Sequence, residues 1–128
     1  MITNLIHNGK LFLSKFRDVG TKKKRSSQWH KVEQKFLDDN PFCAACGTHN
    51  ELQVHHIKPF HLYPELELDP NNLITLCMDT HECHLKIGHG GNWREYCQEV
   101  VQYAAKIKQD ISQFKKIATE AKQNRIKE

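Results

Sequence analysis

The chain has 128 residues, a formal net charge of +4 at pH 7 and 38% hydrophobic residues. This length suits one domain, and the composition is that of a globular protein rather than a disordered or fibrous one. No stretch approaches the roughly eighteen apolar residues of a membrane span. Because the N-terminal "MITNLIHNGKLFLSKF" also lacks the pattern of a secretory signal, we expect an intracellular protein.

The first segment of the chain, residues 1–25, is strongly basic. Residues 1–36 carry nine Lys or Arg against two Asp or Glu. Asn8-Gly9 favours a type I′ turn, so this segment begins either with a small hairpin or irregularly. The bias is sharpest in a run of four cations, Lys22, Lys23, Lys24 and Arg25. Taken alone, such a run is more often a solvated tail than an arm that contacts nucleic-acid phosphates.

A helix is predicted after the basic segment. Ser26 or Ser27 can cap its N-terminus, and the helix ends before Pro41, because the residue preceding a proline avoids the helical region. Its apolar face is formed by Trp29, Val32 and Phe36, with Leu37 beside them. This face is expected to pack on the rest of the domain.

Two short strands are predicted on either side of a loop. The first, "ELQVHHI", alternates, so the adjacent His55 and His56 point to opposite faces. The loop "KPFHLYPELELDPNN" contains three prolines, and "LITLC" forms the second strand. After it, "HECHLKIGH" indicates a helical turn that the glycines of residues 88–91 interrupt.

From Trp93 onward, apolar residues follow the 3-4 spacing of a heptad seam and predict one helix of about 34 residues. The seam residues are Cys97, Val100, Ala104, Ile107, Ile111, Phe114, Ala118 and Ala121. Because several of them are small, the seam is weak. It serves either to pack the helix on the domain or to bind a second copy or a partner protein.

Four of the five cysteines form two pairs, Cys43-x2-Cys46 and Cys77-x5-Cys83. In a reducing compartment paired cysteines more often bind metal than form disulfides. Four thiolates satisfy the tetrahedral preference of Zn²⁺ and leave no position for water, so the zinc would be structural. Scattered core cysteines are the alternative, and His81 or His84 could replace Cys83 as fourth ligand. Cys97 is left over as a buried or seam residue.

The adjacent histidines suggest a division of labour. Because they face opposite ways, one can bind a metal while the other deprotonates a water molecule, and imidazole titrates near neutral pH. Without the other motifs, a pair of surface histidines would be the simpler interpretation.

Together these motifs resemble the HNH nuclease family, in the zinc-knuckle form found in phage and bacterial genomes. The matching stretches are "CAACG", "LQVHHIKPF", "NNLITLC" and "CHLKIGH", in this order. The resemblance implies an α+β fold: a small ββα-metal core with a four-cysteine zinc knuckle, flanked by an N-terminal helix and a long C-terminal helix. We therefore divide the chain into a basic segment (1–25), an HNH domain (26–93) and a C-terminal helix (94–128).

The resemblance also implies a role for each matching residue. His55 and His84 would bind the catalytic divalent ion, and His56 would be the general base. Asn72 would orient the loop that carries the base. His89 would be a further metal ligand or a phosphate contact.

Two departures from the family pattern matter. The long spacer between Cys77 and Cys83 leaves His81 as an alternative to His84. His55 stands where the family often has Asp, and a neutral imidazole favours Mn²⁺, Ni²⁺ or Zn²⁺ alongside Mg²⁺.

The sequence therefore predicts a metal-dependent HNH endonuclease that hydrolyses DNA phosphodiester bonds in a bacterial cytoplasm, encoded by the cell or a phage. Its expected phosphate contacts are Lys22, Lys23, Lys24, Arg25, Lys58 and Arg94. The alternatives are a zinc-containing nucleic-acid-binding module without catalysis and a structural interaction protein.

Overall fold

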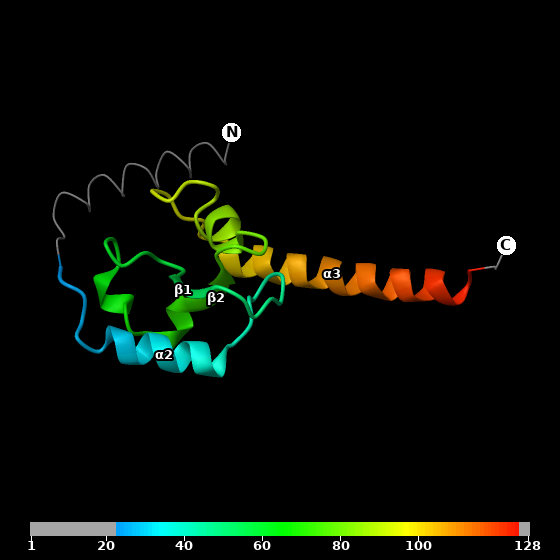
Figure 1. Cartoon of the computed structure of the whole chain (residues 1–128). Coiled ribbons are helices and arrows are strands. Elements are labelled where there is room, and N and C mark those ends of the chain that lie inside the picture. Colours follow the sequence, from blue (N-terminus) through cyan, green and yellow to red (C-terminus); the bar gives the residue numbers. More distant parts are fainter. Residues whose placement is uncertain (1–22, 126–128) are drawn as a thin grey trace, which may run out of the picture.

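The fold was analysed in a computed structural model that describes residues 23–125. The predicted Asn8-Gly9 hairpin and Lys22 lie outside these residues. The principal elements, in chain order, are α2 (Trp29–Asp39), β1 (Leu52–His56), β2 (Leu73–Cys77), the π-helical turn η3 (His84–Gly88) and α3 (Val100–Gln123) (Figure 1). Within residues 23–125, none of the helices combines the length and apolar character that crossing a membrane requires.

The centre of the fold is an antiparallel pair of strands, β1 and β2. Leu52 lies opposite Cys77 at one end of the pair, and His56 lies opposite Leu73 at the other. All five residues of β2 are buried, as a strand covered on both faces requires. The two predicted strands are confirmed, and the loop between them contains two short 3-10 turns, η1 (Pro64–Leu66) and η2 (Pro70–Asn72).

Helix α2 lies against this hairpin with its predicted apolar face half-buried. The predicted cap is wrong, because Gln28 occupies the N-cap position. The Ser26 hydroxyl instead accepts from the N–H of Gln28, in the turn before the helix, and the Ser26 N–H donates to the Glu67 carboxylate. The helix ends at Asp39, ahead of Pro41 as predicted.

Helix α3 is shorter than predicted, with 24 residues beginning at Val100 instead of a helix from Trp93. Residues 93–99 form turns at 93–94 and 98–99 with irregular backbone between them, because their backbone groups bond to the segment around the end of η3. The Cys97 N–H donates to the Gly88 carbonyl, and the Glu95 carbonyl accepts from His89 Nδ1 at 2.6 Å. A continuous helix would have to give up both bonds.

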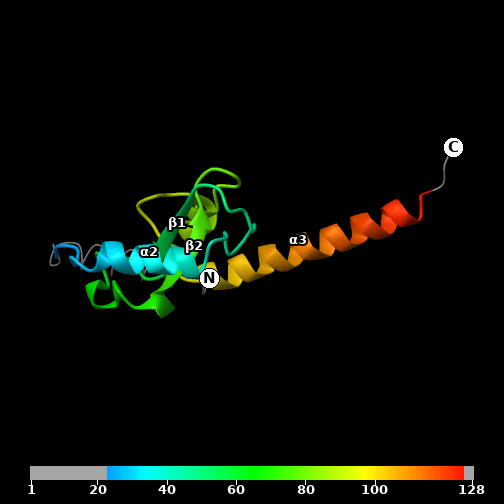
Figure 2. The same cartoon turned by 60° about the horizontal axis from the view of Figure 1, so that its bottom comes forward.

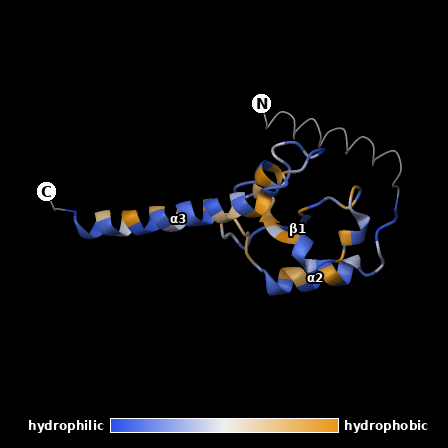
Figure 3. Cartoon of the chain, turned by 180° about the vertical axis from the view of Figure 1, so that it is seen from behind, coloured by the Kyte–Doolittle hydropathy of each residue, from blue (hydrophilic) through white to orange (hydrophobic). Residues whose placement is uncertain are grey.

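Only the first turns of α3 pack on the domain, and the rest projects away from it (Figure 2). Val100 and Ala104 are buried, whereas Phe114, further along the predicted seam, is 72% exposed. The projecting half is mainly hydrophilic with isolated apolar residues (Figure 3). The packing interpretation of the seam thus holds for its first half, while binding of a second copy or partner stays a prediction.

The buried core joins the hairpin to the start of α3 and includes Ile74, Leu76, Val100 and Ala104 together with three cysteines. The chain therefore has the predicted α+β fold: a ββα unit made by β1, β2 and η3, a four-cysteine cluster, and helices at both ends.

Candidate metal centre and nuclease site

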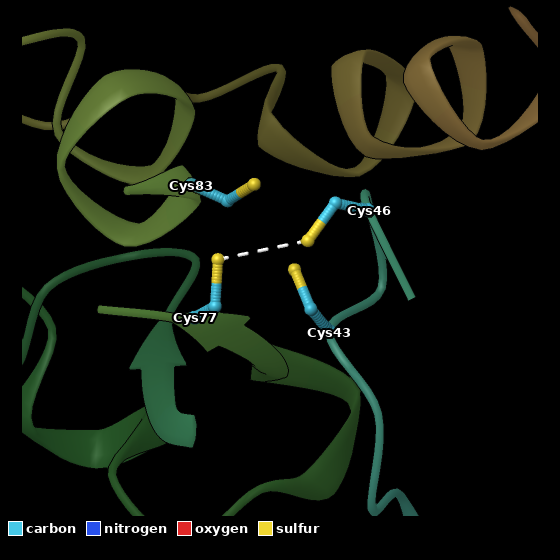
Figure 4. Close-up of side chains that lie close together, drawn as sticks. All are labelled: Cys43, Cys46, Cys77 and Cys83. Atoms are coloured by element: carbon cyan, nitrogen blue, oxygen red, sulfur yellow. Dashed lines mark hydrogen bonds between the residues drawn. The ribbon is translucent and has the colours of Figure 1, made fainter. Parts of the chain in front are cut away.

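The first candidate site is a cluster of four cysteine side chains that point toward one another (Figure 4). Their sulfur atoms all lie within 4.8 Å of each other, and the Cys46 and Cys77 sulfurs are 3.7 Å apart. Two sulfurs at 2.3 Å from one tetrahedral Zn²⁺ are separated by about 3.8 Å, so the cluster already has nearly the spacing of a ZnS₄ site. The members are Cys43, Cys46, Cys77 and Cys83.

Local backbone geometry explains how the unequal spacers converge. In the first pair, Gly47 adopts φ = 78°, and its N–H donates to the Cys43 carbonyl, which closes the tight knuckle. In the second pair, the longer spacer returns through Glu82, which adopts the left-handed φ of 52° directly before Cys83. His81 is exposed and lies outside the cluster.

Burial makes these thiols costly to ionise without a cation. It raises the pKa of Cys46 to about 11 and also raises the pKa of Cys83. For Cys77, burial acts in the same direction, but backbone N–H groups of Cys83 and His81 outweigh it and leave the pKa lowered. Zinc binds thiolates, so a bound Zn²⁺ would supply the positive charge that this donor set requires.

The second candidate site is a cluster of three histidines, His55, His84 and His89. One nitrogen of each ring lies within 4.8 Å of the others, and the three ring centroids are 4.9–5.0 Å apart. Cys83 and His84 are consecutive, so the two clusters share a boundary at the start of η3. His55 and His84 are thus brought together as predicted, with His89 as the third member and His81 outside.

The π-helical turn explains the position of His89. Its N–H donates to the His84 carbonyl at 3.1 Å, five residues back. This wider turn places residues five apart beside each other, whereas an α-helix does so for residues three or four apart. The Nε2 atoms of His84 and His89 consequently lie 3.2 Å apart.

The nitrogen atoms of this cluster are arranged for a cation. The Nδ1 atom of His89 donates to the Glu95 carbonyl, which leaves a lone pair on its Nε2, and the same tautomer of His84 would direct its Nδ1–H to the Met78 sulfur at 3.3 Å. The buried His55 Nε2 has no hydrogen-bond partner among the described residues. Facing lone pairs and an unpartnered buried nitrogen fit a shared metal ion, which imidazole readily binds.

The pKa values of the cluster favour the neutral, metal-binding form. Burial, reinforced by the neighbouring His84 and His89, lowers the pKa of His55 to about 3. Burial and then His89 lower the pKa of His84 to about 4, and burial lowers that of His89 against its hydrogen bond to Glu95. All three imidazoles are therefore neutral near pH 7.

His56 lies on the opposite face of β1 from this cluster and is also buried. Its Nε2 is 3.0 Å from the Glu67 carbonyl oxygen. Because a carbonyl can only accept, Nε2 carries the proton, and Nδ1 keeps the lone pair that a base requires. Burial lowers the pKa of His56, while the hydrogen bond to Glu67 opposes this change.

Asn72 is buried at the start of β2 and ties together the loop that contains Glu67. Its Oδ1 accepts from the Lys58 N–H at 2.9 Å, and its Nδ2 donates to the Lys58 carbonyl at 3.0 Å and to the Leu66 carbonyl at 3.4 Å. Asn72 therefore holds the loop at Leu66, and the next residue, Glu67, contacts His56 through its carbonyl. The orienting role of Asn72 stays a prediction.

A cleft of about 690 Å³ joins the three-histidine cluster to His56, with all four rings in its lining. The predicted phosphate contacts are placed differently around it. Arg25 and Arg94 line the cleft, Lys23 and Lys24 are exposed, and Lys58 lies over the Tyr63 ring at 5.3 Å.

Sequence reasoning missed four residues at this site. Trp29 stacks on His56 with ring centroids 4.5 Å apart, and Trp93 contacts His84 and His89. Glu67 accepts from Ser26 and holds His56 through its carbonyl. Gly88 packs so closely that an added Cβ would lie 3.2 Å from the His55 ring. Of these four, only the two Trp residues were marked in the sequence, because each is an aromatic residue next to a histidine-containing or basic motif.

A strand hairpin and a helical turn that hold a histidine cluster beside a separate sulfur cluster define a small metal-binding domain of the ββα type. Residues 43–90 match the family model described as HNH endonuclease. The match contains both clusters and indicates a nuclease or nucleic-acid-binding function, with DNA as the family's substrate. No curated protein and no solved structure matches the chain.

Proposed function

We propose that the protein is an endonuclease that hydrolyses DNA phosphodiester bonds with one divalent ion and a histidine-activated water. The observation that carries this proposal is the placement of three neutral imidazoles within 4.8 Å of each other in the same cleft as His56. A nucleic-acid-binding module without catalysis has no need for a separate buried histidine whose Nδ1 keeps a lone pair that can accept a proton.

Each group has a defined part in this proposal. His55, His84 and His89 hold the divalent ion, which when bound neutralises charge on the scissile phosphate and the leaving oxygen. His56 accepts a proton from the attacking water at Nδ1, while its Nε2–H stays bonded to Glu67. The four-cysteine cluster holds a Zn²⁺ that stabilises the loop-rich centre and takes no part in the reaction.

The proposed DNA contacts surround the cleft. Arg94 lies at the rim next to Trp93, and Lys23 and Lys24 extend the positive charge beyond the start of α2. Such contacts neutralise backbone phosphates and give affinity without sequence preference. Lys58 lies near Asn72, to whose side chain its backbone is bonded.

The ligand set also predicts which ion works best. Three neutral nitrogen ligands suit Mn²⁺, Ni²⁺ or Zn²⁺ better than Mg²⁺, which prefers oxygen. We expect Mn²⁺ or Ni²⁺ to support more cleavage than Mg²⁺ at equal concentration.

Plasmid cleavage tests the proposal. Supercoiled plasmid is incubated with the protein and Mn²⁺, Ni²⁺ or Mg²⁺, with and without a chelator. His56→Ala should lose about 10²–10⁴ in rate, the usual contribution of a general base, while keeping its zinc content and circular dichroism spectrum. His30→Ala, an exposed histidine on α2, is the matched control. Tight DNA binding without cleavage in any of these metals would leave only the non-catalytic module.

A further inference from the structure

Glu67 is a nearly fully buried carboxylate, 4% exposed, in the loop between the two strands. A buried carboxylate is costly unless it is paired and hydrogen-bonded. Its two oxygens have separate partners at the start of α2. Oε1 accepts from the Ser26 N–H at 3.0 Å, and Oε2 pairs with the Arg25 guanidinium at 3.4 Å.

The same residue contacts the proposed base through its main chain. The Glu67 carbonyl accepts from His56 Nε2 at 3.0 Å. The ring of Trp29, the first residue of α2, also lies against this imidazole, with the ring centroids 4.5 Å apart and the ring planes tilted by 32°. Glu67 therefore contacts the ring directly and also ties down the helix end that carries the stacking partner.

Arg25 contributes to this arrangement in a way that an exposed phosphate contact does not. Its guanidinium lies 5.2 Å from the centre of the Trp29 ring and 4.6 Å from that of Phe60. The side chain is half-exposed, but its charge is directed to a buried carboxylate and to two aromatic faces. These contacts hold Arg25 itself against the cleft wall.

We propose that Glu67 is a positioning residue for His56 and that Arg25 acts through it: the Arg25–Glu67 pair fixes the two groups that contact the base, the Glu67 carbonyl and the Trp29 ring. The pair thereby keeps His56 in one tautomer and one orientation. This deepens the proposed nuclease function and rests on it for its kinetic consequences, but not for the state of the imidazole.

The state of the imidazole is tested without any cleavage assay. Long-range proton–nitrogen correlation spectra of the ¹⁵N-labelled full chain at pH 7.5 report which ring nitrogen is protonated, and His56→Ala assigns the signals. We expect a single Nε2–H form in the parent and exchange between two tautomers in Glu67→Ala. Glu65→Ala, an exposed neighbour on η1, is the matched control and should match the parent. Unchanged His56 signals in folded Glu67→Ala would overturn the proposal.

Kinetics on plasmid separate positioning from phosphate binding. Glu67→Ala should lower kcat about 10–100-fold, less than or equal to the whole contribution of a general base, with little change in KM for DNA. Arg25→Ala should lower kcat in the same direction, and the double variant should be no worse than Glu67→Ala, because the two residues act as one unit. An Arg25→Ala variant that raises KM at unchanged kcat, additively with Glu67→Ala, would contradict the proposal.

If Glu67→Ala does not fold, Glu67→Gln provides a second variant that tests the same proposal. The amide keeps an acceptor for the Ser26 N–H but loses the charge that pairs with Arg25, so a smaller fall in kcat is expected. Should the parent cleave no DNA at all, the proposed nuclease function fails, while the tautomer experiment still decides the role of Glu67.

Discussion

The Nε2 atoms of His84 and His89 lie 3.2 Å apart, although the chain places these residues five positions from each other. Two nitrogens bound to one tetrahedral ion at 2.0–2.1 Å are separated by about 3.3 Å. The π-helical turn therefore presents the two imidazoles with the spacing of a chelate, facing His55 on β1.

This relationship predicts how the histidines share a metal ion. His84→Ala and His89→Ala should each lower Ni²⁺ or Mn²⁺ affinity strongly, because each removes one of three ligands. His81→Ala should leave it unchanged, since this residue is exposed and outside the cluster. Calorimetric titration of the zinc-loaded protein measures the affinity. Equal affinities for His84→Ala and His81→Ala would refute the three-histidine site.

Gly88 predicts a subtler effect on the same cluster. An alanine Cβ there would lie 3.2 Å from His55 Cε1 and from Leu76 Cδ1, closer than ordinary contact. Because Leu76 is fully buried in the core, we expect the His55 ring to shift instead. We expect Gly88→Ala to weaken binding of the divalent ion by about tenfold, the lower range for a disturbed ligand orientation. Zinc content and melting temperature should change little, and an unchanged affinity would show that the site absorbs the methyl group.

The sulfur cluster predicts a different loss. Cys43→Ser should reduce zinc content and unfold the centre, because binding of a structural zinc contributes directly to folding. Cys97→Ser is the matched control, since this cysteine lies outside the cluster and its thiol points to Glu99. Zinc content by mass spectrometry and circular dichroism provide the measurement. A folded, stable Cys43→Ser protein without zinc would disprove the structural role.

The lowered pKa values predict how stability responds to acid. The pKa values of His55 and His84 are about 3 and about 4 in the folded protein, against about 6.5 in an unfolded chain. The unfolded state therefore binds more protons below pH 6.5, so stability is retained above this pH and falls progressively as the pH drops toward 4.

Urea unfolding at pH 7.5 and 5.5, without added divalent ion, measures this response. His84→Gln removes one of the two histidines. Between these pH values, the free energy of unfolding of this variant should fall by about 1 kcal/mol less than that of the parent. The reason is that, at pH 5.5, His84 takes up a proton in the unfolded chain but stays neutral in the folded protein. Identical losses in parent and variant would mean that His84 titrates normally in the folded protein.

The basic residues predict a salt-dependent contribution to DNA binding. Lys23→Ala and Lys24→Ala should each weaken binding about equally for unrelated sequences and reduce the slope of log K against log salt by about 1. Lys122→Ala, near the far end of α3, is the control. Titrations at several salt concentrations that show equal slopes for all three variants would remove these lysines from the DNA interface.

The sequence by itself determined which side chains are available to bind metal in this protein. The paired cysteines, the adjacent histidines on a period-two strand and the polar loop before "LITLC" each carry a local pattern, because ligand type and strand periodicity depend on neighbouring residues. These patterns were enough to predict the hairpin and the sulfur cluster, while the meeting of His55 with His84 was implied by the resemblance to the HNH family.

Only the tertiary structure decided how those groups are held. Main-chain carbonyls of Glu67 and Glu95 orient His56 and His89, and a carbonyl has the same chemistry in every residue, so no sequence pattern marks it. The His89–Glu95 bond, together with that from the Cys97 N–H to the Gly88 carbonyl, also makes α3 begin at Val100 instead of Trp93. The pairing of Arg25 with Glu67 joins residues 42 positions apart, and only the path of the folded backbone brings them into contact.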